Sequence, residues 1–132
     1  MDYIKIGGKA WNVKVVDLER SFAVTYSENT GRTIGVGIPL TLDPLDTSYS
    51  YKLTFTKSDN DLDEFDKLWD YLSYPRGVGL PVELVYNQST LTFDAYVSSG
   101  SQKLKRIDTA HGAVYWDVFT ANFIPVKAQV TP

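Results

Sequence analysis

The chain has 132 residues, a formal net charge of −3 at pH 7 and no cysteine. This length predicts a single domain over residues 1–132 with a sizeable hydrophobic core, and the missing cysteines exclude disulfides, thiol catalysis and cysteine-ligated metals. Residues 59–70 hold six acids and one lysine, a charge of −5, so the other ten acids and twelve bases sum to +2 and favour no general polyanion-binding role.

The first part of the chain alternates apolar and polar residues, which is typical of strands. Strands are predicted over residues 3–6 and 10–16, joined by a Gly7-Gly8 turn into an opening hairpin, and again over residues 22–26. Turn-forming residues in segment 27–32 close the last of these strands.

An irregular arm or long loop is predicted at about residues 27–48, where glycines and prolines interrupt the pattern. Two interpretations stay open: an ordinary surface loop, or an arm that reaches a neighbouring subunit. The second is worth keeping because alternating apolar residues would give an extended arm one apolar face. The candidate interface residues of this segment are Arg32, Ile34, Val36, Ile38, Leu40 and Leu42.

A strand over residues 49–56 leads into a predicted helix from Ser58 to Tyr74. Ser58 can cap its first amide groups, and Pro75 disfavours helical geometry at Tyr74. Helical spacing gathers five apolar residues on one face, which should pack on a sheet. This helix core face comprises Leu62, Phe65, Leu68, Trp69 and Leu72. If Trp69 is buried, Trp69→Ala should cost about 3–5 kcal/mol of stability.

Two more hairpins are predicted after the helix. Residues 82–86 and 91–97 flank the first turn, and residues 103–107 and 113–126 flank the second. Strands on both sides of a single helix favour a mainly β domain with mostly antiparallel strands.

No catalytic, cofactor or metal site is predicted. Asp59, Asp61 and Asp63 have the opening spacing of a calcium-binding loop, but Glu64 stands where that loop needs glycine, so helix capping and solubility are favoured. His111 is the only histidine and lacks the partners of a nucleophilic triad, which favours a turn role. We therefore expect a protein that is not an enzyme, with no small-molecule substrate.

A small basic cluster at Lys103, Lys105 and Arg106 lies late in the chain. On a strand Lys103 and Lys105 share one face and Arg106 points to the other, which is a weak pattern for sequence-specific nucleic-acid binding. Lys103 and Lys105 are instead candidate interface residues at a solvated edge, where they would fit an acidic neighbour such as the helix of another subunit. Since no segment approaches the roughly 20 apolar residues of a membrane span, we expect no membrane insertion.

Across nearly its whole length the chain resembles small tail proteins of long-tailed phages and prophages of Gram-positive bacteria. The resemblance rests on segments 26–32, 42–44, 72–76, 96–100 and 123–128, which read YSENTGR, LDP, LSYPR, YVSSG and FIPVKA.

The resemblance implies a tail-tube type of fold, in which two antiparallel sheets close into a sandwich or barrel with one amphipathic helix at the side. It also implies a structural role in the tail tube, distal tail or baseplate, as a ring of subunits that docks to other tail proteins and carries no catalytic residues. Such a protein belongs to the virion tail and assembles in the bacterial cytoplasm. The alternative function is a β-sandwich module that binds a carbohydrate or surface polymer through exposed aromatic side chains.

Overall fold

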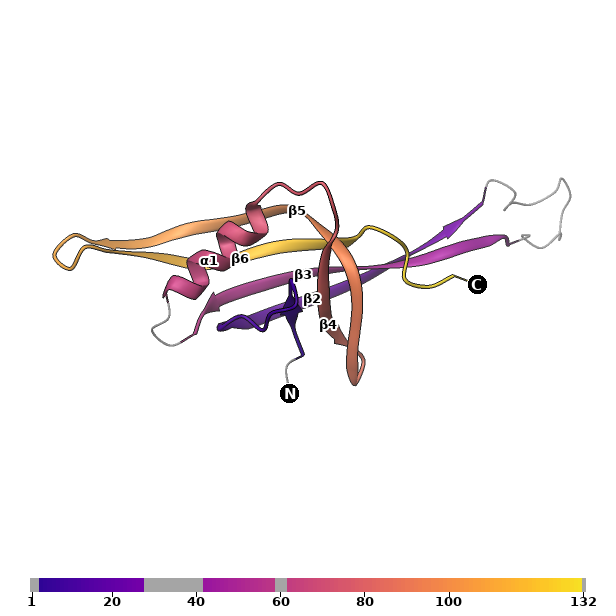
Figure 1. Ribbon diagram of the computed structural model, residues 1–132, viewed down its shortest axis with the longest axis horizontal. Helices are drawn as coiled ribbons and strands as arrows, with labels where there is room; N and C mark the ends of the chain where they lie inside the picture. The colour runs from indigo at the N-terminus through magenta and orange to yellow at the C-terminus, as the bar shows by residue number, and fades with distance from the viewer. Residues whose placement is uncertain (1–2, 28–41, 59–61, 132) are drawn as a thin grey trace, which may run out of the picture.

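The computed structural model describes residues 3–27, 42–58 and 62–131. Within these ranges the chain forms six strands and one helix (Figure 1). In chain order they are β1 (Lys5–Ile6), β2 (Val13–Tyr26), β3 (Pro44–Lys57), α1 (Leu62–Ser73), β4 (Leu80–Tyr86), β5 (Ser89–Asp108) and β6 (Ala113–Pro125). All strand pairs are antiparallel, in the order β1-β4-β5-β6-β3-β2. The predicted mainly β, antiparallel class with a flanking helix is confirmed.

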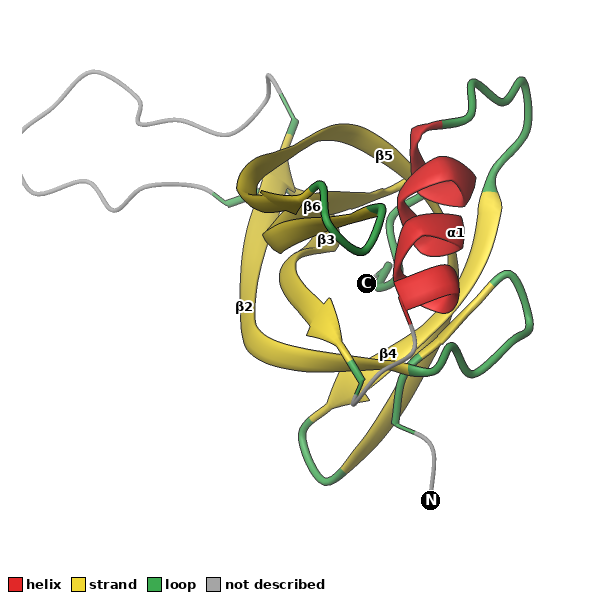
Figure 2. Cartoon of the chain, turned by 90° about the vertical axis from the view of Figure 1, so that its left-hand side faces the viewer, coloured by secondary structure: helices red, strands yellow, loops and turns green. Residues whose placement is uncertain are grey.

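The six strands form one hydrogen-bonded sheet that curls around the core, and α1 lies at one side of this curl (Figure 2). A curled sheet places distant strands face to face, as the twist of long strands favours. The two layers expected for a sandwich or barrel are therefore two parts of a single sheet.

The core lies between the concave face of the sheet and α1. Alternation along β3 directs Tyr51, Leu53 and Phe55 inward, and each is at most 2% exposed. Phe119 of β6 joins sheet and helix, because its ring centroid lies 5.0 Å from that of Phe55 and 5.2 Å from that of Phe65 on α1. These aromatic contacts fix α1 over the middle of the sheet.

The predicted apolar face of the helix does pack on the sheet. Phe65, Leu68 and Leu72 are buried in the core. Trp69 is only half-buried and meets Phe119 edge-on, with 5.5 Å between ring centroids. The side chain of Leu62 lies outside the described residues.

The helix is shorter than its sequence pattern predicts. Ser58 pairs as part of a β-bridge, and the described helix begins at Leu62, with residues 59–61 outside the description. Its last residue is Ser73, because a residue that precedes proline, here Tyr74, is pushed out of helical geometry.

The predicted opening hairpin is wrong. Gly7 and Gly8 have φ angles of +65° and +77° and do turn the chain, but β1 pairs with β4, and β2 pairs with β3. Pairing with β4 buries Ile6 to 1% exposure among core residues, a burial that a local two-stranded hairpin cannot provide.

Several short strands of the prediction are parts of longer ones. Residues 13–16 of the predicted strand at 10–16 and the predicted strand at 22–26 belong to a single β2, whereas residues 10–12 precede it. The predicted strands at 91–97 and 103–107 form a single β5. Residues 44–48, expected to be irregular, begin β3, because they pair with β2 as far as its last residue. β-Bulges on these strands interrupt the alternation of apolar and polar residues without ending the strand. These interruptions had suggested separate elements.

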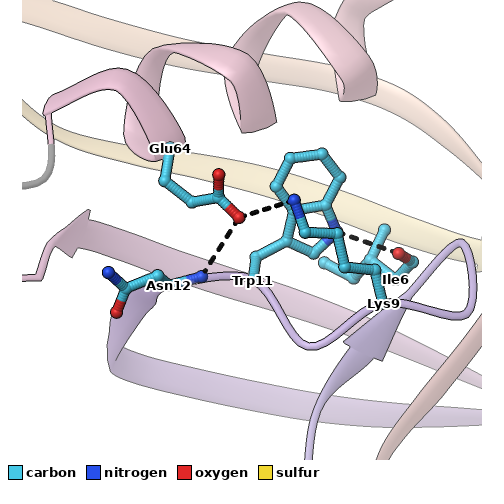
Figure 3. A network of polar contacts seen from close by, with 5 residues as sticks. All are labelled: Ile6, Lys9, Trp11, Asn12 and Glu64. Atoms are coloured by element: carbon cyan, nitrogen blue, oxygen red, sulfur yellow. Dashed lines mark hydrogen bonds and ion pairs between the residues drawn. The ribbon is translucent and has the colours of Figure 1, made fainter.

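A polar network ties the start of α1 to the segment between β1 and β2 (Figure 3). One carboxylate oxygen of Glu64 lies 2.7 Å from Lys9 Nζ and accepts the amide hydrogen of Asn12 at 3.5 Å. The Nε1–H of Trp11 donates to the carbonyl of Ile6 at 2.9 Å. The Trp11 ring also packs against Tyr71 of α1, with 5.2 Å between ring centroids.

Candidate assembly surfaces

Two hairpins extend beyond the core toward opposite ends of the molecule (Figure 1). β3 and β6 pair with each other only at Tyr51–Phe55 and Phe119–Phe123. Farther out, β2 pairs with β3, and β5 with β6. We call residues 21–27 and 42–50 the β2–β3 end, and residues 103–118 the β5–β6 end.

The β2–β3 end exposes large apolar side chains along one face. Phe22 is 72% exposed, and Val24 and Tyr26, which alternation places on the same face of β2, are also exposed. Leu42 and Leu45 on the partner strand side are exposed as well. This is far more apolar surface in one place than a scatter of single residues.

The β5–β6 end carries a second apolar face. Leu104 stands opposite Trp116, and Ile107 opposite Val114. Trp116 and Val114 share a face because they are two residues apart on β6, so the four side chains form one patch. Each is between 42% and 59% exposed. Trp116 therefore lies outside the core.

The other face of the β5–β6 end is basic. The Arg106 guanidinium lies 4.4 Å from the ring centroid of Tyr115, and Lys57 Nζ lies 5.1 Å from the same ring. Lys103 and Lys105, the predicted interface residues, are exposed on the same strand, β5. Such aromatic contacts hold part of the positive charge in place.

The two ends differ in charge. The β2–β3 end contains Asp43 and Asp46 and no Lys or Arg among its residues, a sum of −2. The β5–β6 end contains Lys103, Lys105 and Arg106 against Asp108 and Asp117, a sum of +1 with His111 neutral.

The strand edges of these ends are also unequal. The segment after β6 closes the outer edge of β3: Thr47 and Val130 exchange backbone hydrogen bonds of 2.9 and 3.2 Å. The side-chain amide of Gln129 both accepts from the N–H of Tyr49 and donates to its carbonyl, each at 2.9 Å. By contrast, among the described strands none pairs with the outer edge of β2.

Of the interface residues predicted from sequence, the structure places Leu42, Lys103 and Lys105 on these exposed ends. Leu42 belongs to the β2–β3 end, whereas the two lysines belong to the β5–β6 end, so the set does not form one site. The others, Arg32, Ile34, Val36, Ile38 and Leu40, lie outside the described residues. Sequence reasoning missed Phe22, Leu104 and Ile107 as surface residues. The chain has more large apolar residues than one 12-residue helix can cover. This excess was the available signal that some of them are exposed.

The outer face of α1 is acidic. Asp63, Asp66 and Asp70 lie at helical spacing away from the core face. Partial burial raises the pKa of Asp66 above its ordinary value, and the neighbouring carboxylates of Asp70 and Asp63 raise it further.

A cavity of about 540 Å³ opens between the C-terminal end of α1 and β5. Tyr74, Arg76 and Tyr96 stand at its wall, together with Ser98 and Ser99. The Arg76 guanidinium is stacked 4.2 Å above the ring centroid of Tyr71. The cavity thus combines aromatic surface, hydroxyl groups and one positioned cation.

Groups that would support metal chemistry do not cluster in the described ranges. No set of three or more His, Cys, Asp or Glu side chains there could hold a metal ion, and Asp59 and Asp61 of the calcium-like spacing lie outside them. His111 belongs to a turn, where its backbone N–H and its Nδ1 both contact the carboxylate of Asp108, at 3.3 and 2.9 Å. Within the same described residues, no helix reaches the length and apolarity that crossing a bilayer requires.

Comparison with models of known protein families and with curated proteins finds no match to this chain.

Proposed function

We propose that the chain is a noncatalytic structural component of a phage or prophage tail, in the tube, the distal tail or the baseplate. It acts by self-association, as a ring of subunits in the virion tail, and by docking to other tail proteins. The observation that carries this proposal is the pair of projecting hairpins with exposed apolar faces at opposite ends of the molecule.

The single chain leaves large apolar side chains and strand edges exposed to water. An isolated chain gains nothing from long strands that leave Phe22 and Trp116 in water, and such surfaces and edges invite association. Association into a closed ring needs two different surfaces on each subunit. Two projecting ends, unlike in charge and sequence, meet that requirement.

The test is the oligomeric state across concentration. Size-exclusion chromatography with light scattering and negative-stain imaging should find closed oligomers, either of the chain alone or together with products of adjacent tail genes as templates. A protein that stays monomeric up to millimolar concentration, and binds none of those products, would contradict the proposal.

A second function, binding of a carbohydrate or surface polymer, is favoured by one observation: the cavity beside Tyr74 and Tyr96. Aromatic faces stack on sugar rings, and hydroxyl groups and Arg76 can hydrogen-bond to them. A glycan array tests this function. A reproducible signal that Tyr96→Ala abolishes and Tyr3→Ala preserves would support it, because Tyr3 is exposed but lies outside this cavity. A blank array would reject it.

A further inference from the structure

From the two exposed ends we infer that the β2–β3 end of one copy docks on the β5–β6 end of the next copy, and that their opposite charges set this head-to-tail direction. The inference rests on the proposed self-association and goes beyond it by naming the two mating surfaces. Each end combines exposed apolar side chains with a net charge, negative at the β2–β3 end and positive at the β5–β6 end.

The apolar faces supply the attraction. Phe22, Val24 and Tyr26 on one copy would cover Leu104 and Trp116 on the next, and both sets leave water. The acidic outer face of α1 is a poorer partner for this patch, because its Asp63, Asp66 and Asp70 would have to be desolvated against apolar side chains.

The charges supply the direction. Two β2–β3 ends, each of charge −2, repel one another, and so do two β5–β6 ends, each with Lys103 and Lys105 exposed. Only the unlike pair attracts. Charge complementarity of this kind suppresses wrong pairings and guides encounter more than it adds affinity. The contact therefore joins unlike surfaces, which is what a ring requires.

The edges agree with this direction. At the β2–β3 end the segment around Gln129 already closes the outer edge of β3, whereas the outer edge of β2 pairs with no described strand. At the β5–β6 end, the pairing of β5 with β4 stops at Ala95, so its continuation toward Lys103 has a free side in the described sheet. Exposed lysines on such an edge oppose pairing with a like edge.

The experiment uses two charge-reversed full-length proteins. One carries Lys103→Glu and Lys105→Glu, the other Asp43→Lys and Asp46→Lys, and all four positions lie outside the buried core. Each protein alone should associate at least about tenfold more weakly than the unchanged chain, because like charges then face each other. An equimolar mixture should associate again, with alternating copies visible by native mass spectrometry. Circular dichroism must show the same thermal unfolding for both proteins.

A matched control separates the two acidic surfaces. In a protein with Lys103→Glu and Lys105→Glu, adding Asp43→Lys and Asp46→Lys restores the net charge of −3, and so does adding Asp63→Lys and Asp70→Lys on α1. Association should return only with the first pair. Rescue by the helix pair would overturn the inference and assign the contact to α1.

Two further outcomes are distinguishable. If both charge-reversed proteins associate as the unchanged chain does, the inference fails and the proposed self-association stands. If the unchanged chain neither associates with itself nor joins products of adjacent tail genes, the proposed function fails first.

Discussion

Leu68 and Trp69 are neighbours on the same predicted helix face, yet they differ in depth. Leu68 is fully buried, whereas Trp69 is half-buried with one edge on Phe119. We expect Leu68→Ala to lower the free energy of unfolding by about 2–5 kcal/mol. Trp69→Ala should cost only about 1–3 kcal/mol, less than full burial implies, because part of the indole stays in water. Urea unfolding of both variants measures this, and a larger loss for Trp69→Ala would contradict the assigned depths.

Asp66 carries an unfavourable charge in the folded protein. Its raised pKa means that the folded state holds the proton more tightly than the unfolded state does. The cost of its charge is therefore absent at low pH and grows as pH rises through the folded pKa. Asp66→Asn should stabilise the protein at pH 7 by about 0.2–0.5 kcal/mol, the size of one like-charge pair at helical spacing, and less at high salt. Unfolding at pH 7 and pH 3 tests this: an equal gain at both pH values would exclude the charge as its source.

Gly7 is required where it stands. Its φ of +65° disfavours any side chain, and an added Cβ would lie 2.1 Å from the hydroxyl oxygen of Tyr71. Gly8 has a φ of +77° but open space around it. Gly8→Ala should therefore cost only the backbone term of about 1–2 kcal/mol, and Gly7→Ala more than that. Thermal unfolding of the two variants makes the comparison, and equal losses would show that Tyr71 moves aside freely.

At the scale of elements, the segment after β6 acts as a short additional strand made partly from a side chain. Gln129 supplies the donor and the acceptor that a strand residue would offer to Tyr49. In Gln129→Ala the amide of Tyr49 should exchange its hydrogen about tenfold faster or more, since a lost hydrogen bond of about 1.5 kcal/mol corresponds to that factor. Hydrogen exchange followed by NMR measures it. Unchanged protection at Tyr49 would show that the Thr47 and Val130 pair closes the edge alone.

The elements also show what the sequence could predict. Alternation along β3 and helical spacing around Leu68 identified the strand and the helix face correctly, because both patterns are local. The partner of β1 could not be found this way, since Ile6 gains its burial from β4, far along the chain. The length of β5 was missed because its bulges break the period of two. Whether the two ends are exposed depends on how much of the sheet the helix covers. A local sequence pattern carries no information about that coverage.

For the whole molecule, stability and assembly should be separable. Trp116→Ala removes a side chain from the exposed patch of the β5–β6 end, whereas Phe119→Ala, three residues on, opens the core. We expect Trp116→Ala to change the free energy of unfolding by about 0.5 kcal/mol or less but to weaken self-association. Phe119→Ala should cost about 3–5 kcal/mol. Light scattering and urea unfolding together test this, and a large stability loss in Trp116→Ala would place that side chain in the monomer's core.

The closure of β3 by the residues around Gln129 has a consequence for biosynthesis. This segment follows β6, the last of the described strands, so on the ribosome these six strands can pair while the outer edge of β3 is still uncovered. Nascent chains on one messenger would then meet with an additional pairing edge available, the kind of exposure that leads to misassembly. Emergence of residues 126–131 ends that period and leaves a subunit with its β3 edge already closed.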